Sequence, residues 1–105
     1  MVSEQDIQFL SDQIVQLFHA EKIILFGSHA YGHPRQDSDV DLLVLLPFSG
    51  NTFRKSQDIL NLIEPKFSVD LIVRNPQDAQ RRHQQGDPLM REVFDRGRVL
   101  YERCH

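Results

Sequence analysis

An unbroken apolar stretch in the middle of the chain constrains the fold more than any other feature. From Val40 to Leu46 every residue except Asp41 is apolar. Successive side chains of a strand point to opposite faces of its sheet, so a strand with this sequence is apolar on both faces beyond the aspartate. Such a strand belongs in a central position, covered by helices on at least one side. We therefore expect an α/β protein, with helices packed on a small mixed β-sheet, rather than a β-sandwich.

An amphipathic helix and a first strand are expected ahead of this stretch. Ser3, followed three residues later by Asp6, resembles a capping pair that opens a helix. Apolar residues then recur at helical spacing, which predicts one stripe of core side chains. These are Ile7, Leu10, Ile14, Leu17 and Phe18. The first strand is expected at about residues 22 to 27.

A second amphipathic helix and a third strand are expected after the central stretch. Residues 47 to 51 have the composition of a turn, and a helix that Pro65 terminates follows them. The apolar residues expected on its core side are Phe53, Ile59, Leu60 and Ile63. The third strand is expected at about residues 67 to 73.

Two helices and a short strand are expected to complete the fold. Asn75-Pro76 and Asp87-Pro88 each place a capping residue before a proline at the first helical position. The last helix should turn Leu89, Met90, Val93 and Phe94 inward, end near Gly97, and lead into a strand over residues 99 to 101. The preceding segment, 77 to 85, has only Ala79 as an apolar residue. It is either a solvated helix or a contact surface for an acidic partner or a nucleotide.

A turn suited to anions follows the first strand. The run Ile23 to Phe26 is rich in strand formers and ends at Gly27. We expect Ser28 to cap a short helix, so that the free backbone N–H groups of its first turn and the bare glycine backbone face an anion. A phosphate group would fit this turn.

A pair of carboxylates opens the central strand. Asp39 and Asp41 are two residues apart, so both side chains project from the same face. Their Cα atoms would lie roughly 7 Å apart, which allows them to share divalent cations about 3.5–4 Å apart. Mg²⁺ takes oxygen ligands and often completes its shell with substrate phosphates. If the first two strands run antiparallel, the glycine turn and the aspartates meet at one edge of the sheet.

The pattern G-S-x10-D-x-D, with Ala30, Gly32 and Ser38 inside it, resembles the signature of the DNA polymerase beta-type nucleotidyltransferase superfamily. Within that superfamily the chain resembles the minimal nucleotidyltransferases (MNT proteins), the MntA-like antitoxins often encoded beside HEPN-domain partners. The resemblance implies a polymerase beta-like nucleotidyltransferase fold, with residues 1–105 forming a single minimal domain. It also implies a third carboxylate on a later strand, where Asp70 stands. The family often has arginine before the second glycine, but this chain has Tyr31.

The resemblance further implies a reaction, in which AMP moves from ATP to a hydroxyl group and pyrophosphate leaves. Gly27 and Ser28 would bind the nucleotide through its outer phosphates. Asp39 and Asp41 would be catalytic and would anchor Mg²⁺, with two ions expected. Asp70 would lie beside the acceptor, as a further metal ligand, as the base that accepts the hydroxyl proton, or as both.

The acceptor and the partner are also implied by the resemblance. A chain of 105 residues uses almost all of its length for the minimal sheet and helices, so the acceptor surface should come from elsewhere. The expected partner is a HEPN-type toxin, silenced by modification of a tyrosine. Two alternatives remain: an antitoxin that acts by binding alone, and a small-molecule nucleotidyltransferase of the aminoglycoside type. The second would need a homo-oligomer to build its acceptor pocket. Nucleotide preference, acceptor and oligomeric state stay open.

Composition excludes several other classes. The chain is 40% hydrophobic and 26% charged, as expected for one compact domain. It has no apolar run long enough to span a membrane. Its formal net charge of −3 argues against direct nucleic-acid binding as its main work. The first residues lack the basic and apolar regions of a signal peptide, so we expect a cytoplasmic location. The one cysteine, Cys104, cannot form an internal disulfide.

Zinc and serine chemistry are weaker hypotheses. His29 and His33 are four residues apart and would share one face of a helix. A structural zinc site, however, needs four nitrogen or sulfur ligands, and Cys104 is the only thiol. We therefore expect these histidines to lie in a loop near phosphates. No general base is discernible beside Ser28, which favours a phosphate contact over a nucleophile.

Overall fold

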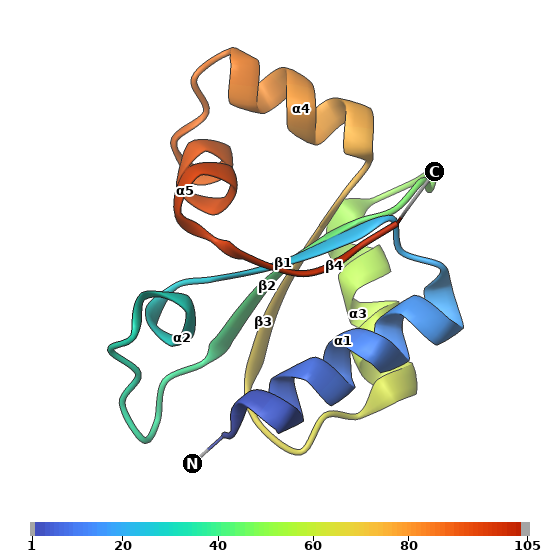
Figure 1. The fold of residues 1–105 in the computed structure, drawn as a ribbon. Coiled ribbons are helices and arrows are strands. Elements are labelled where there is room, and N and C mark those ends of the chain that lie inside the picture. Colours follow the sequence, from blue (N-terminus) through green and yellow to red (C-terminus); the bar gives the residue numbers. More distant parts are fainter. Residues whose placement is uncertain (1, 104–105) are drawn as a thin grey trace.

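The computed structural model describes residues 2–103, so Cys104 lies outside the described residues. Figure 1 shows how the helices and strands follow one another along the chain. In chain order they are α1 (Glu4–Phe18), β1 (Lys22–Phe26), α2 (Ser28–Tyr31), β2 (Val40–Leu45), α3 (Thr52–Ile63), β3 (Val69–Arg74), α4 (Pro76–Gln84), α5 (Pro88–Arg96) and β4 (Arg98–Glu102). None of these helices is long and apolar enough to cross a membrane.

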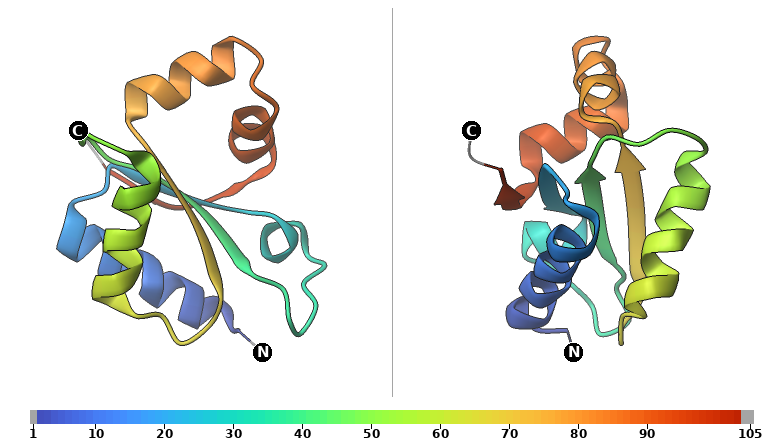
Figure 2. Two further views of the ribbon diagram at one scale, coloured as in Figure 1. Left: turned by 180° about the vertical axis from the view of Figure 1, so that it is seen from behind. Right: turned by 90° about the vertical axis from the view of Figure 1, so that its right-hand side faces the viewer.

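The strands form one mixed sheet in the order β3-β2-β1-β4. β1 runs antiparallel to both β2 and β4, whereas β2 and β3 run parallel. Helices cover both faces of the sheet, with α1 and α3 on one face and α4 and α5 on the other (Figure 1 and Figure 2). The α/β architecture with a mixed sheet is thus confirmed, and so is the antiparallel arrangement of the first two strands.

The central strand β2 is buried on both faces, as its sequence predicts. Val40, Leu42 and Val44 face α1 and α3 and belong to one apolar cluster. Leu43 and Leu45 face the other way and pack in a second cluster with side chains of α4 and α5. The alternation of strand side chains therefore joins two cores through one strand. Asp41 shares the second face, at the end of β2 where the helices leave it partly open.

Side-chain caps define where several helices begin. Asp6 donates its backbone N–H to Ser3 Oγ (3.1 Å), and Ser3 donates its own to Asp6 Oδ2 (3.0 Å), which confirms the predicted capping pair of α1. Asp87 Oδ1 caps α5 by accepting the N–H of Met90 (3.1 Å). Asn75 precedes α4, but its Oδ1 accepts from Phe48 N (2.9 Å) and so joins the loop after β2 to the start of α4.

Two residues expected in the core are exposed instead. Leu17 is 51% exposed, and Phe53 is 70% exposed. Phe18, which is partly buried against the core, continues the apolar stripe of α1, and its neighbour Leu17 points roughly 100° away around the helix. Phe53 lies six residues before the buried Ile59, so their side chains point roughly 120° apart. The expectation that Leu17 and Phe53 lie in the core is therefore wrong, because helical spacing alone assigned too wide a face to the core.

Candidate functional site

Gly27 joins β1 to the short helix α2 in a conformation that only glycine adopts readily. Its φ is 75° and its ψ is −161°. A Cβ at this position would overlap Oδ2 of Asp41 and lie 3.0 Å from Asp41 Cγ. Both backbone angle and space therefore require glycine. The Asp41 carboxylate packs directly against the bare backbone of the turn.

The prediction that Ser28 caps α2 is wrong. Gly27 is the capping residue, no side chain caps this helix, and Ser28 is its first residue. The Gly27 carbonyl accepts the N–H groups of Ala30 (3.0 Å) and Tyr31 (3.1 Å), which closes the single turn. Ser28 thus stands directly beside the glycine with a half-buried side chain.

Strand register places two of the predicted aspartates side by side. Asp41 is opposite Phe26 of β1, the residue before the glycine turn, and opposite Asp70 of β3. Residues directly opposite one another in a sheet project from the same face. The glycine turn and Asp70 therefore flank Asp41 from the two neighbouring strands. Asp41 is half-buried and Asp70 is exposed.

Asp39 stands two residues before Asp41, in the loop that leads into β2, and is exposed. This loop is held by local contacts. His29 Nε2 of α2 lies 3.3 Å from the Ser38 carbonyl oxygen, and Ser38 Oγ accepts the N–H of Arg35 (2.7 Å). His29 thus connects α2 to the residue before Asp39.

The carboxylates act on one another electrostatically. Burial, followed in order of effect by the negative charges of Asp70 and Asp39, raises the pKa of Asp41 from its ordinary 3.8 to about 6. Glu92 of α5 also raises this pKa, and His29 lowers it. The end of the sheet therefore concentrates negative charge around a carboxylate that is partly withdrawn from water.

The donor set determines which cation would fit here. Within residues 2–103 no three His, Cys, Asp or Glu side chains lie close enough to hold one metal ion. The charges of Asp39 and Asp70 do act on Asp41, since both raise the pKa of its carboxyl group. Carboxylate oxygens are ligands for hard cations, which keep several water ligands and take others from phosphates. These carboxylates are therefore of the ligand type that Mg²⁺ takes, although residues 2–103 do not bring three such ligands together.

Two residues of α5 join the site without any signal in the sequence pattern. The Arg96 guanidinium carbon lies 4.2 Å from the centre of the Tyr31 ring at the end of α2. Burial raises the pKa of the Tyr31 hydroxyl, and the charge of Glu92 raises it too. That hydroxyl is buried and makes no hydrogen bond of normal geometry in the described part of the chain. Glu92 and Arg96 are four residues apart and therefore lie on the same face of α5. The sequence alone does not indicate that this face turns toward α2.

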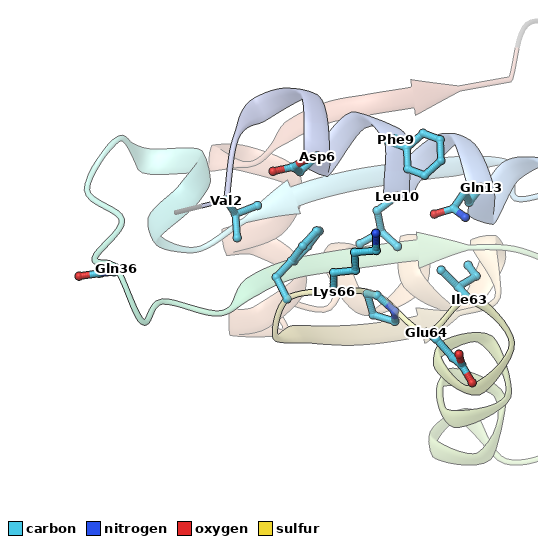
Figure 3. A pocket seen from close by; sticks show the side chains of 11 residues that line it. Val2, Asp6, Phe9, Leu10, Gln13, Gln36, Ile63, Glu64 and Lys66 are labelled. Carbon is cyan, nitrogen blue, oxygen red and sulfur yellow. The ribbon is translucent and has the colours of Figure 1, made fainter.

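A cavity of about 540 Å³ lies beside α1. It is bounded by α1, by the end of α3, by the loop that leads to β3 and by Gln36 of the loop that leads to β2. Figure 3 shows side chains of α1 such as Phe9 and Leu10 on one side and Ile63 and Lys66 on the other. Asp39, Asp41 and Asp70 do not line it. The candidate site is therefore an open end of the sheet and not this hollow.

Comparisons with known proteins concern the family and the fold of the chain. The sequence model of the family described as "Polymerase beta, Nucleotidyltransferase" matches residues 7–105. A candidate nucleotidyltransferase from Sulfolobus solfataricus superimposes with a TM-score of 0.67 at 20% identity, covering 94% of this chain and 79% of that one. A search of curated proteins finds no match.

Toxin–antitoxin structures are also similar in fold. One, described as a toxin–antitoxin with AMP-PNP, gives a TM-score of 0.60 at 21% identity, covering 97% of this chain and 75% of that one. Another is the complex of tri-AMPylated Shewanella oneidensis HEPN toxin with MNT antitoxin, with a TM-score of 0.51 at 19% identity, covering 91% and 72% of the two chains. At these identities the likeness establishes the fold, which is the polymerase beta-like nucleotidyltransferase fold.

Proposed function

Since the chain belongs to the polymerase beta nucleotidyltransferase family, we propose that it transfers AMP from ATP to a hydroxyl group of a protein partner. One observation carries the proposal. Asp41 lies on β2, between β1 and β3, and meets the glycine turn on one side and Asp70 on the other. A nucleotide whose phosphates lie along this end of the sheet would contact the turn and the carboxylates together.

The glycine turn would hold the outer phosphates. Because Gly27 has no side chain, its backbone lies directly against the Asp41 carboxylate, so a phosphate bound at the turn would lie beside that carboxylate. Ser28, directly after Gly27, would add a hydroxyl donor to a phosphate oxygen. Asp39, Asp41 and, if it acts as a ligand, Asp70 would hold two Mg²⁺ ions, which when bound neutralise charge on the transferring and leaving groups.

Asp70 would act on the acceptor. It is exposed at the start of β3, on the side of Asp41 away from the glycine turn. In the transfer the acceptor oxygen bonds to the α-phosphorus of ATP, and the bond from that phosphorus to the bridging oxygen of pyrophosphate breaks. The hydroxyl proton has to leave, and we assign its acceptance to the Asp70 carboxylate.

The acceptor proposed is a tyrosine of a HEPN-type toxin, with this chain as the antitoxin. The support is the fold shared with an MNT antitoxin in complex with a tri-AMPylated HEPN toxin. The net charge of −3 would favour encounter with a basic, RNA-cleaving partner. The cavity beside α1 is not lined by the aspartates, so nothing favours a small-molecule acceptor bound there.

Incubation of the purified pair with ATP and Mg²⁺ tests the proposal. Intact mass measurement should show one or more AMP groups added to a partner tyrosine, together with loss of its nuclease activity. The double variant Asp39→Asn, Asp41→Asn should add none. The variant Asp70→Asn should bind ATP but transfer about 10²–10⁴-fold more slowly, if Asp70 is the base.

A matched control makes the result specific. Asp12 and Asp58 are exposed on α1 and α3, away from the site. Changing both to Asn alters the net charge by the same amount as the double site variant and should leave transfer unchanged. If wild type silences the partner without any change of mass, and the site variant silences it equally well, the chain acts by binding alone and the enzymatic proposal is wrong.

A further inference from the structure

Arg96 occupies an unusual position for a surface arginine. It is the last residue of α5 and is exposed. Its guanidinium makes no ion pair with a carboxylate within residues 2–103. Instead it lies over the Tyr31 ring, 4.2 Å from the ring centre. Stacking on an aromatic face leaves the N–H groups at the edge of the guanidinium free to donate.

Tyr31, whose ring lies beneath the Arg96 guanidinium, belongs to the helical turn that Gly27 opens. Tyr31 donates its backbone N–H to the Gly27 carbonyl (3.1 Å), so the two residues open and close the same helical turn. Figure 1 shows α2 and α5 at the same end of the sheet. Glu92, one turn before Arg96, is close enough to influence the charge of both Tyr31 and Asp41. Arg96 therefore stands at the rim of the site, on the side of the glycine turn.

The excess of negative charge at the site indicates why a bound nucleotide would need a positively charged residue such as Arg96. The carboxylates of Asp39, Asp70 and Glu92 all lie close enough to Asp41 to act on its charge, so this end of the sheet is rich in negative charge. A nucleoside triphosphate brings further negative charge, and the phosphates beyond the reach of metal ions need donors from the protein. A guanidinium with free N–H groups is suited to bind phosphate oxygens in pairs.

We infer that Arg96 is a phosphate-binding residue of this chain: held by the Tyr31 ring, its guanidinium contacts the outer phosphates of the bound nucleoside triphosphate. The inference rests on the proposed function. The outer phosphates are the ones concerned because Gly27 and Asp70 lie on opposite sides of Asp41, and Arg96 is on the Gly27 side. Tyr31 is a positioning residue in this arrangement, and its hydroxyl takes no part.

Calorimetric titration with ATP and with AMP, both in the presence of Mg²⁺, tests the inference. Arg96→Gln should weaken ATP binding on the order of tenfold and leave AMP binding unchanged, because AMP lacks the outer phosphates. Arg91→Gln is the matched control, since Arg91 is an exposed arginine of the same helix and should not affect either ligand. Tyr31→Leu removes the ring beneath Arg96 and should weaken ATP binding as Arg96→Gln does, while leaving AMP binding unchanged.

The outcomes separate the inference from the proposed function. If wild type binds ATP and Arg96→Gln binds it equally well, Arg96 does not contact the phosphates, although the proposed function stands. If Arg96→Gln weakens ATP and AMP equally and lowers the melting temperature, the stacked pair only joins α2 to α5 and the inference is wrong. If wild type itself fails to bind ATP, the proposed function fails first, and the inference with it.

Discussion

At the scale of single residues, Gly27 differs from the other four glycines because it combines a positive φ with a lack of space for a side chain. Two requirements coincide there, a φ of 75° and a lack of room for any Cβ because Asp41 Oδ2 occupies that space. Gly50 meets only the first requirement, since its φ is 101° and nothing lies within 4 Å of its ideal Cβ. A substitution at Gly50 therefore tests backbone strain alone, whereas a substitution at Gly27 tests backbone strain together with steric overlap.

We predict that Gly27→Ala destabilises the protein more than Gly50→Ala. The backbone term alone is worth about 1–3 kcal/mol, and in Gly27→Ala the displacement of the Asp41 carboxylate adds to it. Urea unfolding of both variants measures the difference, and titration with ATP and Mg²⁺ should show weaker binding for Gly27→Ala alone. Equal stability and equal ATP affinity of the two variants would contradict this account of the turn.

Asp41 links the site to the pH dependence of stability. Its pKa is about 6 in the folded chain, against an ordinary value of 3.8. The folded state therefore binds the proton more tightly than the unfolded state does. Protonation of Asp41 therefore stabilises the fold. This stabilisation is complete below about pH 4 and is lost as the pH rises through 6. Above that range the ionised Asp41 destabilises the fold.

We predict that Asp41→Asn is more stable than wild type at pH 7 in the presence of a chelator. The gain should shrink as the pH falls from 6 to 4, since wild-type Asp41 then becomes neutral. Melting temperatures of both proteins across this range measure the effect, with Asp58→Asn on the exposed face of α3 as control. A difference that does not vary with pH would show that Asp41 does not carry the perturbed pKa.

At the scale of elements, the contacts between α4 and α5 indicate the role of the polar segment 77 to 85, for which the sequence left two alternatives. Its basic side chains have acidic neighbours within these two helices: Arg81 and Arg82 pair with Asp78, and His83 Nε2 lies 3.0 Å from Asp95 Oδ1. Ala79 is the one residue of α4 that is fully buried. These contacts favour a solvated helix over a binding surface, because the basic groups already have acidic partners.

The junction between α5 and β4 is packed more tightly than its backbone angles suggest. Gly97 has an ordinary extended conformation, with φ −72°. A Cβ there would nevertheless overlap the Val93 carbonyl oxygen and lie 2.6 Å from Ile24 Cγ2 of β1. Glycine is needed at this position for close approach of the helix end to the sheet, not for its backbone freedom.

We predict that Gly97→Ala costs about 1–3 kcal/mol of stability through overpacking. It should also weaken ATP binding, because Arg96 is the neighbouring residue and would move with the helix end. Gly86→Ala is a useful comparison, since an ideal Cβ there meets only the Arg91 side chain, at 3.9 Å, and the cost is confined to a φ of 87°. Wild-type stability of Gly97→Ala in urea unfolding would be inconsistent with this packing.

At the scale of the whole molecule, the candidate site is a single open end of a sheet. The glycine turn, the aspartates and Arg96 all gather at that end. Asp70 faces outward from it. Under the proposed function, an acceptor would therefore approach Asp70 from outside this end of the sheet.

We predict that the isolated chain releases pyrophosphate from ATP very slowly, and that addition of the HEPN-type partner accelerates release to match the AMP groups gained by the partner. The reason is that no acceptor hydroxyl is positioned without the partner. A coupled pyrophosphate assay beside intact mass measurement gives the ratio. Rapid release by the chain alone, with no modified product, would show that the partner is not the acceptor.

The sequence by itself determined the elements and most of the candidate residues. The apolar stretch around Leu43 predicted a central strand, Ser3 and Asp87 predicted helix starts, and the spacing of Gly27 and Asp41 predicted that the two would meet. These predictions succeed because they depend on side-chain periodicity and on residues close together in the chain. The core assignments of Leu17 and Phe53 failed because periodicity places a residue on a face but does not set how wide the buried face is.

Only the tertiary structure decided how the elements meet. The register that puts Asp70 opposite Asp41, the lack of room at Gly27, and the stacking of Arg96 on Tyr31 each join residues from different elements. Tyr31 and Arg96 are distant in sequence, and which face of α5 turns toward α2 follows from the packing of Met90 and Val93 on the sheet. Such contacts depend on the packing of the whole core, so no local pattern in the sequence encodes them.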